Sequence, residues 1–190
     1  MIKKQLILSP CVAIMILLFI GCGKNKTGSS DSTNVTTKDS AAIPEAQMVA
    51  ANLVRVDSLD LIAFNKQDTD LLYKFYNDSV VAVDPDGNSV VGSIAHMKEL
   101  KDMFDQIPDI KIISHQAKFG SGDWTCVTGM LSGSSTKPTK GLDGKPIPAT
   151  GKNFVIPFCM VANWKAGRIV EQRLYWDNQS MLKQMSTGMQ

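Results

Sequence analysis

Past its first 21 residues, this 190-residue chain has no excess of charge of either sign. The sequence contains 20 basic and 18 acidic residues, and Lys3 and Lys4 are the only charged residues among the first 21. The rest of the chain therefore holds 18 basic and 18 acidic residues. Domains that bind nucleic acid usually carry a clustered positive excess. The missing excess argues against a nucleic acid partner.

The chain also lacks the patterns that mark several kinds of catalytic site. Its two histidines, His96 and His115, have no cysteines clustered near them, so no metal-binding spacing is present. There is no glycine-rich phosphate loop, no nucleophile elbow and no zinc-protease motif. We therefore expect no metal and no cofactor.

Long apolar runs are missing everywhere except near the amino terminus. There, Lys3 and Lys4 precede an apolar run over residues 6–20, which is the pattern of an export signal. The run is shorter than the roughly 20 residues that cross a bilayer. Residues 19–22, Phe-Ile-Gly-Cys, resemble the bacterial lipobox, whose cysteine is acylated and becomes the first mature residue. The sequence therefore predicts a signal peptide over residues 1–21 and a lipoprotein anchored to a membrane of the cell envelope through Cys22.

The residues after the predicted lipidation site divide into a tether and a domain. Residues 22–40 contain one aliphatic residue, Val35. Such a segment buries too little apolar surface to offset the entropy of ordering, so we expect a disordered tether. Residues 41–190 have a length that suits one domain with one hydrophobic core.

Cysteine is scarce within this domain, where Cys126 and Cys159 are the only two. They lie symmetrically about a loop centred between Leu142 and Asp143, so an unbulged hairpin would place them opposite each other on paired strands. An exported protein reaches a compartment that permits disulfides. Two small buried thiols are the alternative, because one bulge or a shifted register separates the pair.

Helical and β-strand patterns follow one another along the domain. Helical spacing and capping signals predict helices over residues 44–65, from 68 or 69 to 76, over 93–107, and a short one over 178–185. β-branched runs bounded by turns predict strands over residues 79–83, 89–91, 110–119, 124–132, 154–164 and 168–176. Helices followed by a meander indicate an α+β fold, with three N-terminal helices on one face of a curved antiparallel sheet.

Two of the helices contain an apolar stripe that predicts their buried face. The stripe of the first helix consists of Met48, Ala51, Val54, Leu61 and Ile62. The stripe of the third helix consists of Ile94, Met97, Leu100, Phe104 and Ile107. Because His96 lies off the second stripe, we expect its side chain in solvent.

Short motifs spread over residues 45–186 give the chain a family resemblance. In chain order they are Asn65-Lys66-Gln67-Asp68, Asp84-Pro85-Asp86-Gly87, Gly92, Pro108-Asp109, Gly122-Asp123, Pro148 with Thr150-Gly151-Lys152, Gly167-Arg168-Ile169-Val170-Glu171, and Trp176-Asp177 with Leu182 and Gln184. In this order and spacing they resemble the SnoaL-like polyketide (ester) cyclases. This family belongs to the nuclear transport factor 2-like superfamily of cone-shaped α+β domains.

The resemblance implies an apolar pocket at the open end of the cone, a small hydrophobic ligand, and chemistry without a cofactor. In the cyclases, an aspartate at the position of Asp177 is the general base and acid of an intramolecular aldol ring closure. A free aspartate has a pKa of about 3.9, so desolvation must raise the pKa for this role. Trp176, Phe158 and Met160 would supply that desolvation if they line the pocket.

Asp177 also stands at the start of the last predicted helix, where its side chain would cap free backbone amides. The sequence leaves the cap and the catalytic role open, and one residue is able to fill both. Many relatives have a further acidic residue three positions earlier, where this chain has Leu174. That difference points to lost chemistry or to a changed ligand.

Five more residues are candidates for ligand binding. Arg173 and Tyr175 share strand parity with the candidate aspartate, so a regular strand would place all three on one face. That face is either a polar pocket wall or an exposed, salt-bridged surface. His115 lies in a strand and points either into the pocket or toward the surface or core. Trp124 and Tyr73 are either core aromatics or part of the pocket rim.

Two functions remain open from the sequence, and a homo-oligomer is compatible with both. One is a cofactor-independent cyclase or isomerase-type lyase in which Asp177 abstracts a proton, so that Asp177→Asn abolishes turnover and spares the fold. The other is a non-catalytic envelope module that binds a small ligand or a partner protein. The export signal favours the second, because polyketide intermediates are made in the cytoplasm. The fold alone does not decide, since the superfamily hosts both.

Overall fold

The computed structural model describes residues 44–140 and 144–187. Cys22, the predicted signal peptide and the predicted tether lie outside the described residues. The helices are α1 (Glu45–Asp57), its π-helical continuation η1 (Ser58–Phe64), α2 (Thr69–Tyr73), α3 (Ser93–Gln106) and α4 (Asn178–Thr187). The strands are β1 (Tyr76–Val83), β2 (Ser89–Val91), β3 (Lys111–Ser121), β4 (Trp124–Ser134), β5 (Thr139–Lys140), β6 (Pro146–Ile147), β7 (Asn153–Lys165) and β8 (Arg168–Trp176). Within these ranges, no helix is both long and apolar enough to cross a membrane.

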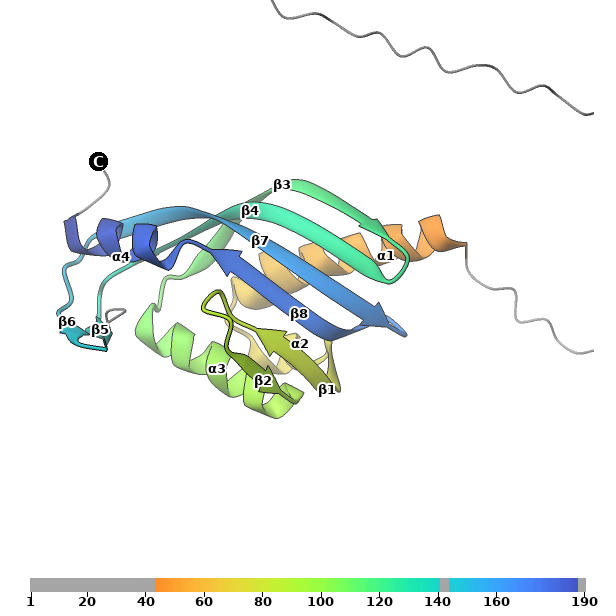
Figure 1. The fold of residues 1–190 in the computed structure, drawn as a ribbon, viewed down its shortest axis with the longest axis horizontal. Helices are drawn as coiled ribbons and strands as arrows, with labels where there is room; N and C mark the ends of the chain where they lie inside the picture. Colours follow the sequence, from red (N-terminus) through yellow and green to blue (C-terminus); the bar gives the residue numbers. More distant parts are fainter. Residues whose placement is uncertain (1–43, 141–143, 188–190) are drawn as a thin grey trace, which may run out of the picture. The chain divides into compact units, whose positions relative to one another are not determined.

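Six of the strands form one curved sheet in the order β2-β1-β8-β7-β4-β3 (Figure 1). The fold is therefore the α+β class that the sequence predicted. Neighbouring strands are antiparallel as expected, except that β1 and β8 run parallel. These two strands are far apart in the sequence, so no hairpin turn dictates their relative direction.

Helices α1, α2 and α3 lie on one side of the sheet (Figure 1), and the hydrophobic core fills the space between. Strand β7 shows how the sequence builds this layer. Its residues alternate between buried and more exposed positions, and the buried set faces the helices. The buried set is Phe154, Ile156, Phe158, Met160, Ala162 and Trp164. Helix α4 packs against β7 at the end of the sheet where β8 ends.

The turn between β7 and β8 shows why the sequence predicted the start of β8 correctly. Lys165 pairs with Arg168, which leaves Ala166 and Gly167 as a two-residue turn. Both have positive φ angles, 48° and 73°, as a type I′ hairpin requires. The predicted bounds of β8 and β2 are confirmed. The prediction missed the two short strands β5 and β6, which lie in the loop after β4.

The predicted stripe of the first helix was wrong. Val54, Leu61 and Ile62 are exposed. The buried face instead consists of Asn52, Val56, Leu59, Asp60 and Ala63. Two of these residues are polar, so the pattern of apolar residues did not reveal this face. The change from α to π geometry at Ser58 also alters the helical period on which the prediction rested.

The predicted stripe of the third helix is confirmed at Leu100, Phe104 and Ile107, which are buried, but not at its first residue. Ile94, which begins the predicted stripe, is 79 % exposed. His96, expected in solvent, is 3 % exposed and points inward. The buried residues of α3 are Ser93, His96, Leu100 and Phe104. A histidine therefore replaces an isoleucine on the buried face, which reverses the hydropathy on which the prediction rested.

Cys126 and Cys159 lie on neighbouring strands but not directly opposite each other. Cys126 pairs with Val161, and Thr128 pairs with Cys159. The thiols are therefore diagonal neighbours, with their Sγ atoms 3.7 Å apart, and both cysteines are free and half-buried. The symmetric-hairpin expectation was wrong in register. The observed register places Val161, two residues beyond Cys159, opposite Cys126.

Candidate functional site

Two adjoining cavities lie between the helices and the sheet. The inner cavity, beside η1 and β1, has a volume of about 40 Å³. The outer cavity, beside α3, α4 and the β1–β2 turn, has a volume of about 360 Å³. They share the lining residues Leu100, Met103, Leu131, Leu174 and Trp176. Because they share these residues, we describe the two cavities together as one pocket.

The inner cavity is mostly apolar but has three buried polar residues in its wall. These are Asp60 from η1, Tyr76 from β1 and Gln172 from β8, which are 4 %, 2 % and 3 % exposed. The Tyr76 hydroxyl donates a hydrogen bond of 2.7 Å to Oε1 of Gln172. Burial and the negative charge of Asp60 raise the pKa of Tyr76, so its hydroxyl remains a donor.

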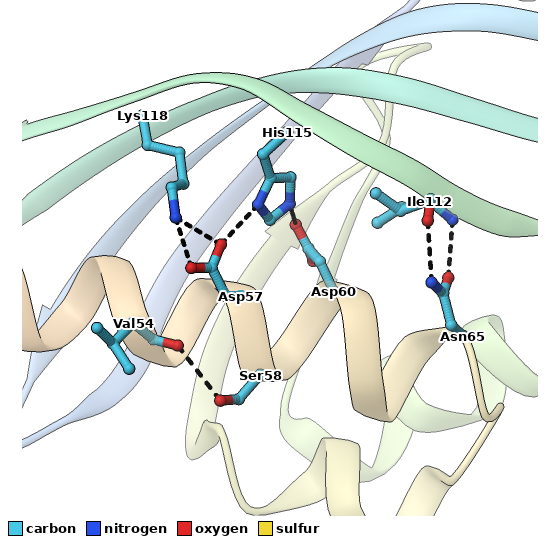
Figure 2. Close-up of polar contacts among 8 residues, drawn as sticks. All are labelled: Val54, Asp57, Ser58, Asp60, Asn65, Ile112, His115 and Lys118. Carbon is cyan, nitrogen blue, oxygen red and sulfur yellow. Dashed lines mark hydrogen bonds and ion pairs between the residues drawn. The ribbon is translucent and has the colours of Figure 1, made fainter.

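His115 on β3 lies between two carboxylates of the long helix (Figure 2). Its Nε2 is 2.9 Å from Oδ2 of Asp60, and its Nδ1 is 2.8 Å from Oδ1 of Asp57. Lys118, on the same strand, donates to the Asp57 carboxylate, with Nζ 2.6 Å from Oδ1. The side chains of His115 and Asp60 are 5 % and 6 % exposed, whereas that of Asp57 is 37 % exposed. The polar row therefore runs from the inner cavity to the solvent.

The geometry of this row requires a shared proton. Each ring nitrogen of His115 faces a carboxylate oxygen at hydrogen-bond distance, so each contact needs one proton. Two arrangements satisfy this requirement: an imidazolium between two carboxylates, or a neutral imidazole with one protonated carboxyl group. Both place one proton in the contact between His115 and Asp60 and another in the contact between His115 and Asp57. The row can therefore accept a proton from, or supply one to, a group in the inner cavity.

The surroundings of the three groups shift their pKa values in different ways. Burial raises the pKa of Asp60, although the hydrogen bond with His115 opposes the shift. Burial lowers the pKa of His115, but its hydrogen bonds to Asp60 and Asp57 outweigh burial and leave the pKa above 6.5. Burial raises the pKa of Asp57, but its hydrogen bonds with Lys118 and His115 outweigh burial and leave the pKa below 3.8. Asp57 is thus the fixed anion, and the proton belongs to the Asp60–His115 pair.

Local irregularities on both elements aim these side chains at each other. The helix becomes π-helical at Ser58, whose hydroxyl donates to the carbonyl of Val54 (Figure 2). On β3, the pairing with β4 shifts just before and just after His115. Such bulges re-aim side chains. Asn65 then fastens the helix end to β3, since its side chain makes hydrogen bonds of 2.9 and 2.8 Å with the backbone of Ile112.

Comparison with known proteins assigns this chain to a family. The family model of the SnoaL-like polyketide cyclases matches residues 53–185. The chain belongs to this family. No curated protein matches the SnoaL-like chain by sequence.

Solved structures share the fold of this SnoaL-like domain at low sequence identity. A protein from a Jannaschia species, described as a SnoaL-like polyketide cyclase, has a TM-score of 0.65 and 18 % identity, over 74 % of this chain and 94 % of its own. One from Xanthomonas campestris, described as a polyketide cyclase, has a TM-score of 0.66 and 20 % identity, over 73 % of this chain and 99 % of its own. IdmH from Streptomyces antibioticus, described as a polyketide cyclase, has a TM-score of 0.55 and 20 % identity, over 73 % of this chain and 96 % of its own.

Asp177, the sequence candidate for the general base of this SnoaL-like domain, caps α4. Its Oδ1 accepts a hydrogen bond of 3.1 Å from the backbone N–H of Ser180, and the Ser180 hydroxyl donates to Oδ2. These hydrogen bonds lower the pKa of Asp177, whereas a general base was expected to have a raised pKa. The carboxylate is exposed and is not among the residues that line the two cavities described here. Its catalytic role stays a prediction.

The apolar residues that were expected to desolvate Asp177 surround a different carboxylate. Trp176, Phe158 and Met160 all line the inner cavity. The acidic residue in the wall of that cavity is Asp60. The desolvated carboxylate of the inner cavity therefore comes from the first long helix, not from the end of β8.

Arg173 and Tyr175 lie on the face of β8 opposite to the cavities. They are exposed, and Arg173 forms an ion pair of 2.7 Å with Glu171. The residues of β8 that line the cavities are Gln172, Leu174 and Trp176. The exposed, salt-bridged surface is therefore the alternative that the structure shows. Strand parity placed these side chains together but did not say which face meets the helices.

The remaining candidates divide between the site and the surface. Trp124 is 41 % exposed, and Tyr73 donates to Asp78 at the surface. Neither lines the two cavities described here. The side chain of His115 is buried, and it reaches the pocket through Asp60. The sequence analysis missed Asp60. The available signal was an acidic residue directly after Leu59 on the buried helix face, which the misplaced stripe concealed.

Proposed function

We propose that this protein is an exported, lipid-anchored member of the SnoaL-like family that performs proton transfer on a small, mostly apolar ligand, with Asp60 as the general base and acid. The observation that carries the proposal is the carboxylate of Asp60, buried in an apolar cavity wall and joined to His115 at 2.9 Å. Desolvation raises the pKa of this carboxyl group toward the range in which proton transfer near neutral pH is efficient.

The roles follow from the hydrogen bonds of each group. In its ionised form, Asp60 takes a proton from a carbon next to a ligand carbonyl, and His115 holds the carboxylate in place. Oδ1 of Asp60, which makes no hydrogen bond to any described residue, is the oxygen free to do so. Because Oε1 of Gln172 accepts from Tyr76, the Gln172 amide N–H remains as a donor to the carbonyl oxygen of the ligand.

The sizes of the cavities favour this division of the ligand. A volume of about 40 Å³ exceeds the 10–15 Å³ or so that one water needs, so the inner cavity admits a small group such as a carbonyl and its neighbouring carbon. The body of the ligand would occupy the outer cavity of about 360 Å³. The ligand would thus present its reactive end to Asp60.

The location rests on the amino-terminal sequence. The apolar run over residues 6–20 and the lipobox-like residues 19–22 support export and acylation of Cys22. Attachment outside the inner membrane separates the protein from cytoplasmic polyketide intermediates. We therefore assign proton abstraction from a carbon acid of the cell envelope, rather than polyketide ring closure.

Native mass spectrometry in D2O tests this function. The purified chain is incubated with cell-envelope extract, and the retained ligand is released and weighed. The wild type should retain a carbonyl compound that has gained deuterium at the carbon next to its carbonyl. Asp60→Asn should retain the same compound without added deuterium. Asp177→Asn, which alters an exposed carboxylate, is the matched control and should exchange like the wild type.

A different outcome would favour the second candidate, a binding module without catalysis. A ligand retained without deuterium by the wild type would contradict proton transfer and keep the pocket as a binding site. Exchange lost in Asp177→Asn but kept in Asp60→Asn would return the base role to Asp177.

A further inference from the structure

The outer cavity contains a buried histidine whose ring nitrogens have no hydrogen-bond partner among the described residues. The side chain of His96 is 4 % exposed, and it lines the outer cavity. Its ring meets the ring of Tyr76 edge-on, with the centroids 4.8 Å apart. Buried polar atoms are normally hydrogen-bonded, and leaving them unpaired costs free energy. Pairing one of these nitrogens with a ligand group would therefore recover part of that free energy.

The form of the ring decides which ligand group fits. Burial lowers the pKa of His96 to about 4, so the imidazole is neutral at neutral pH. A neutral imidazole has one N–H donor and one bare nitrogen, which is an acceptor. Oε2 of Glu99 lies 3.7 Å from Nδ1 of this ring. A hydrogen-bond donor placed between these groups would satisfy both.

The mouth of the outer cavity is acidic. Four carboxylates, which we call the acidic mouth, line it: Asp84, Asp86, Glu99 and Asp102. No lysine or arginine is among the described lining residues. Asp102 is paired with Lys98 at 2.6 Å, but Glu99 makes no hydrogen bond to any described residue. Burial, with the charges of Asp84 and Asp102, raises the pKa of Glu99, as expected where like charges gather.

We propose that the ligand of this pocket carries a cationic ammonium group, held between the carboxylate of Glu99 and the neutral imidazole of His96. The ammonium has three N–H donors, which suit the bare nitrogen of His96 and the oxygens of Glu99. Its apolar body lies against Leu100, Met103 and Leu131 on the shared wall of the two cavities. The inference rests on the proposed function in one respect, that this pocket is where the ligand binds.

Three eight-carbon probes of equal length test the inference: octylamine, octan-1-ol and octanoate. Their binding to the purified chain is measured by calorimetry at neutral pH and low salt. Octylamine should bind at least about tenfold more tightly than octan-1-ol, and octanoate should bind most weakly, because a charge-assisted hydrogen bond is stronger than a neutral one. Added salt should weaken octylamine binding and leave octan-1-ol binding unchanged.

Variants locate the ammonium site. Glu99→Gln removes the charge of a side chain that is 56 % exposed, so the fold is retained. It should weaken octylamine binding about tenfold and leave octan-1-ol binding unchanged. His96→Phe keeps an aromatic ring beside Tyr76 and should also weaken octylamine binding. Asp105→Asn removes an acidic charge on the same helix outside the outer cavity, and it is the control that should bind as the wild type does.

Other results would overturn the inference. Equal affinity for octylamine and octan-1-ol, an unchanged octylamine affinity in Glu99→Gln, or no binding of any probe would each do so. Failure here is distinct from failure of the proposed function. If octan-1-ol binds as tightly as octylamine, the ligand is not cationic but the pocket is still a binding site. Failure of the proposed function would instead be seen in the deuterium exchange of the wild type and of Asp60→Asn.

Discussion

The hydroxyl of Tyr76 donates a hydrogen bond of 2.7 Å to Oε1 of Gln172 in the wall of the inner cavity. This bond joins β1 to β8, the one parallel pair of the six-stranded sheet. Both side chains are buried. The bond therefore contributes to stability, and it also fixes which end of the Gln172 amide faces the cavity.

Tyr76→Phe should lower the free energy of unfolding by about 1–3 kcal/mol, because it leaves the buried Oε1 of Gln172 without a donor. Urea unfolding measures the change. Tyr175→Phe is the matched control, since Tyr175 is 51 % exposed on the outer face of β8. It should change stability by less than about 0.5 kcal/mol. Equal losses in the two variants would contradict a structural role for the buried hydroxyl.

Because the pKa of His115 is raised in the folded state, we expect stability to fall as the pH rises above neutral. Its pKa in the folded state lies above 6.5, so its stabilising contribution is complete below pH 6.5 and is lost as the pH rises through the folded-state value. The free energy of unfolding should therefore be smaller at about pH 9 than at about pH 6. In His115→Gln this decrease should be smaller.

Urea unfolding at the two pH values checks this prediction. The lowered pKa of Asp57 does not interfere, because its contribution is lost only as the pH falls below 3.8. Equal decreases in wild type and His115→Gln would show that His115 does not gain a proton-dependent partner on folding.

The cap at α4 separates two roles of Asp177. Asp177→Ala should lower stability by about 1 kcal/mol, because the backbone N–H of Ser180 loses its acceptor. Asp177→Asn should retain most of the stability, since asparagine is also a good cap. Thermal unfolding and amide exchange of α4 measure both. An Asp177→Ala chain as stable as the wild type would contradict the cap.

Lipidation is tested at Cys22. If the thiol is acylated, the wild-type chain should remain with the membrane fraction and incorporate an alkyne analogue of palmitate. Cys22→Ser should lose the label and leave the membrane fraction. Without buried acyl chains, a chain that carries no net charge binds a membrane surface far less strongly. Cys126→Ser is the control and should keep both the label and the membrane association.

Sequence patterns predicted the sheet better than the helices. Strands β2 and β8 were placed with their bounds, because β-branched runs end at turns whose residues are locally required. The buried face of the first helix was misplaced because it includes Asn52 and Asp60, and His96 of the third helix was wrongly expected in solvent. A polar residue on a buried face has partners from distant elements, and hydropathy does not reveal such partners.

The sequence by itself determined the α+β order of elements and the SnoaL-like family, because these depend on short patterns of neighbouring residues; export and lipidation stay predictions from the same kind of pattern. The tertiary structure alone decided which carboxylate is buried in the pocket. Asp60 and His115 are 55 residues apart, and bulges on β3 and a π-helical segment bring them to 2.9 Å. The sequence predicted which residues of β8 share a face. Only the packing of the helices decided that Gln172 faces inward and Arg173 outward.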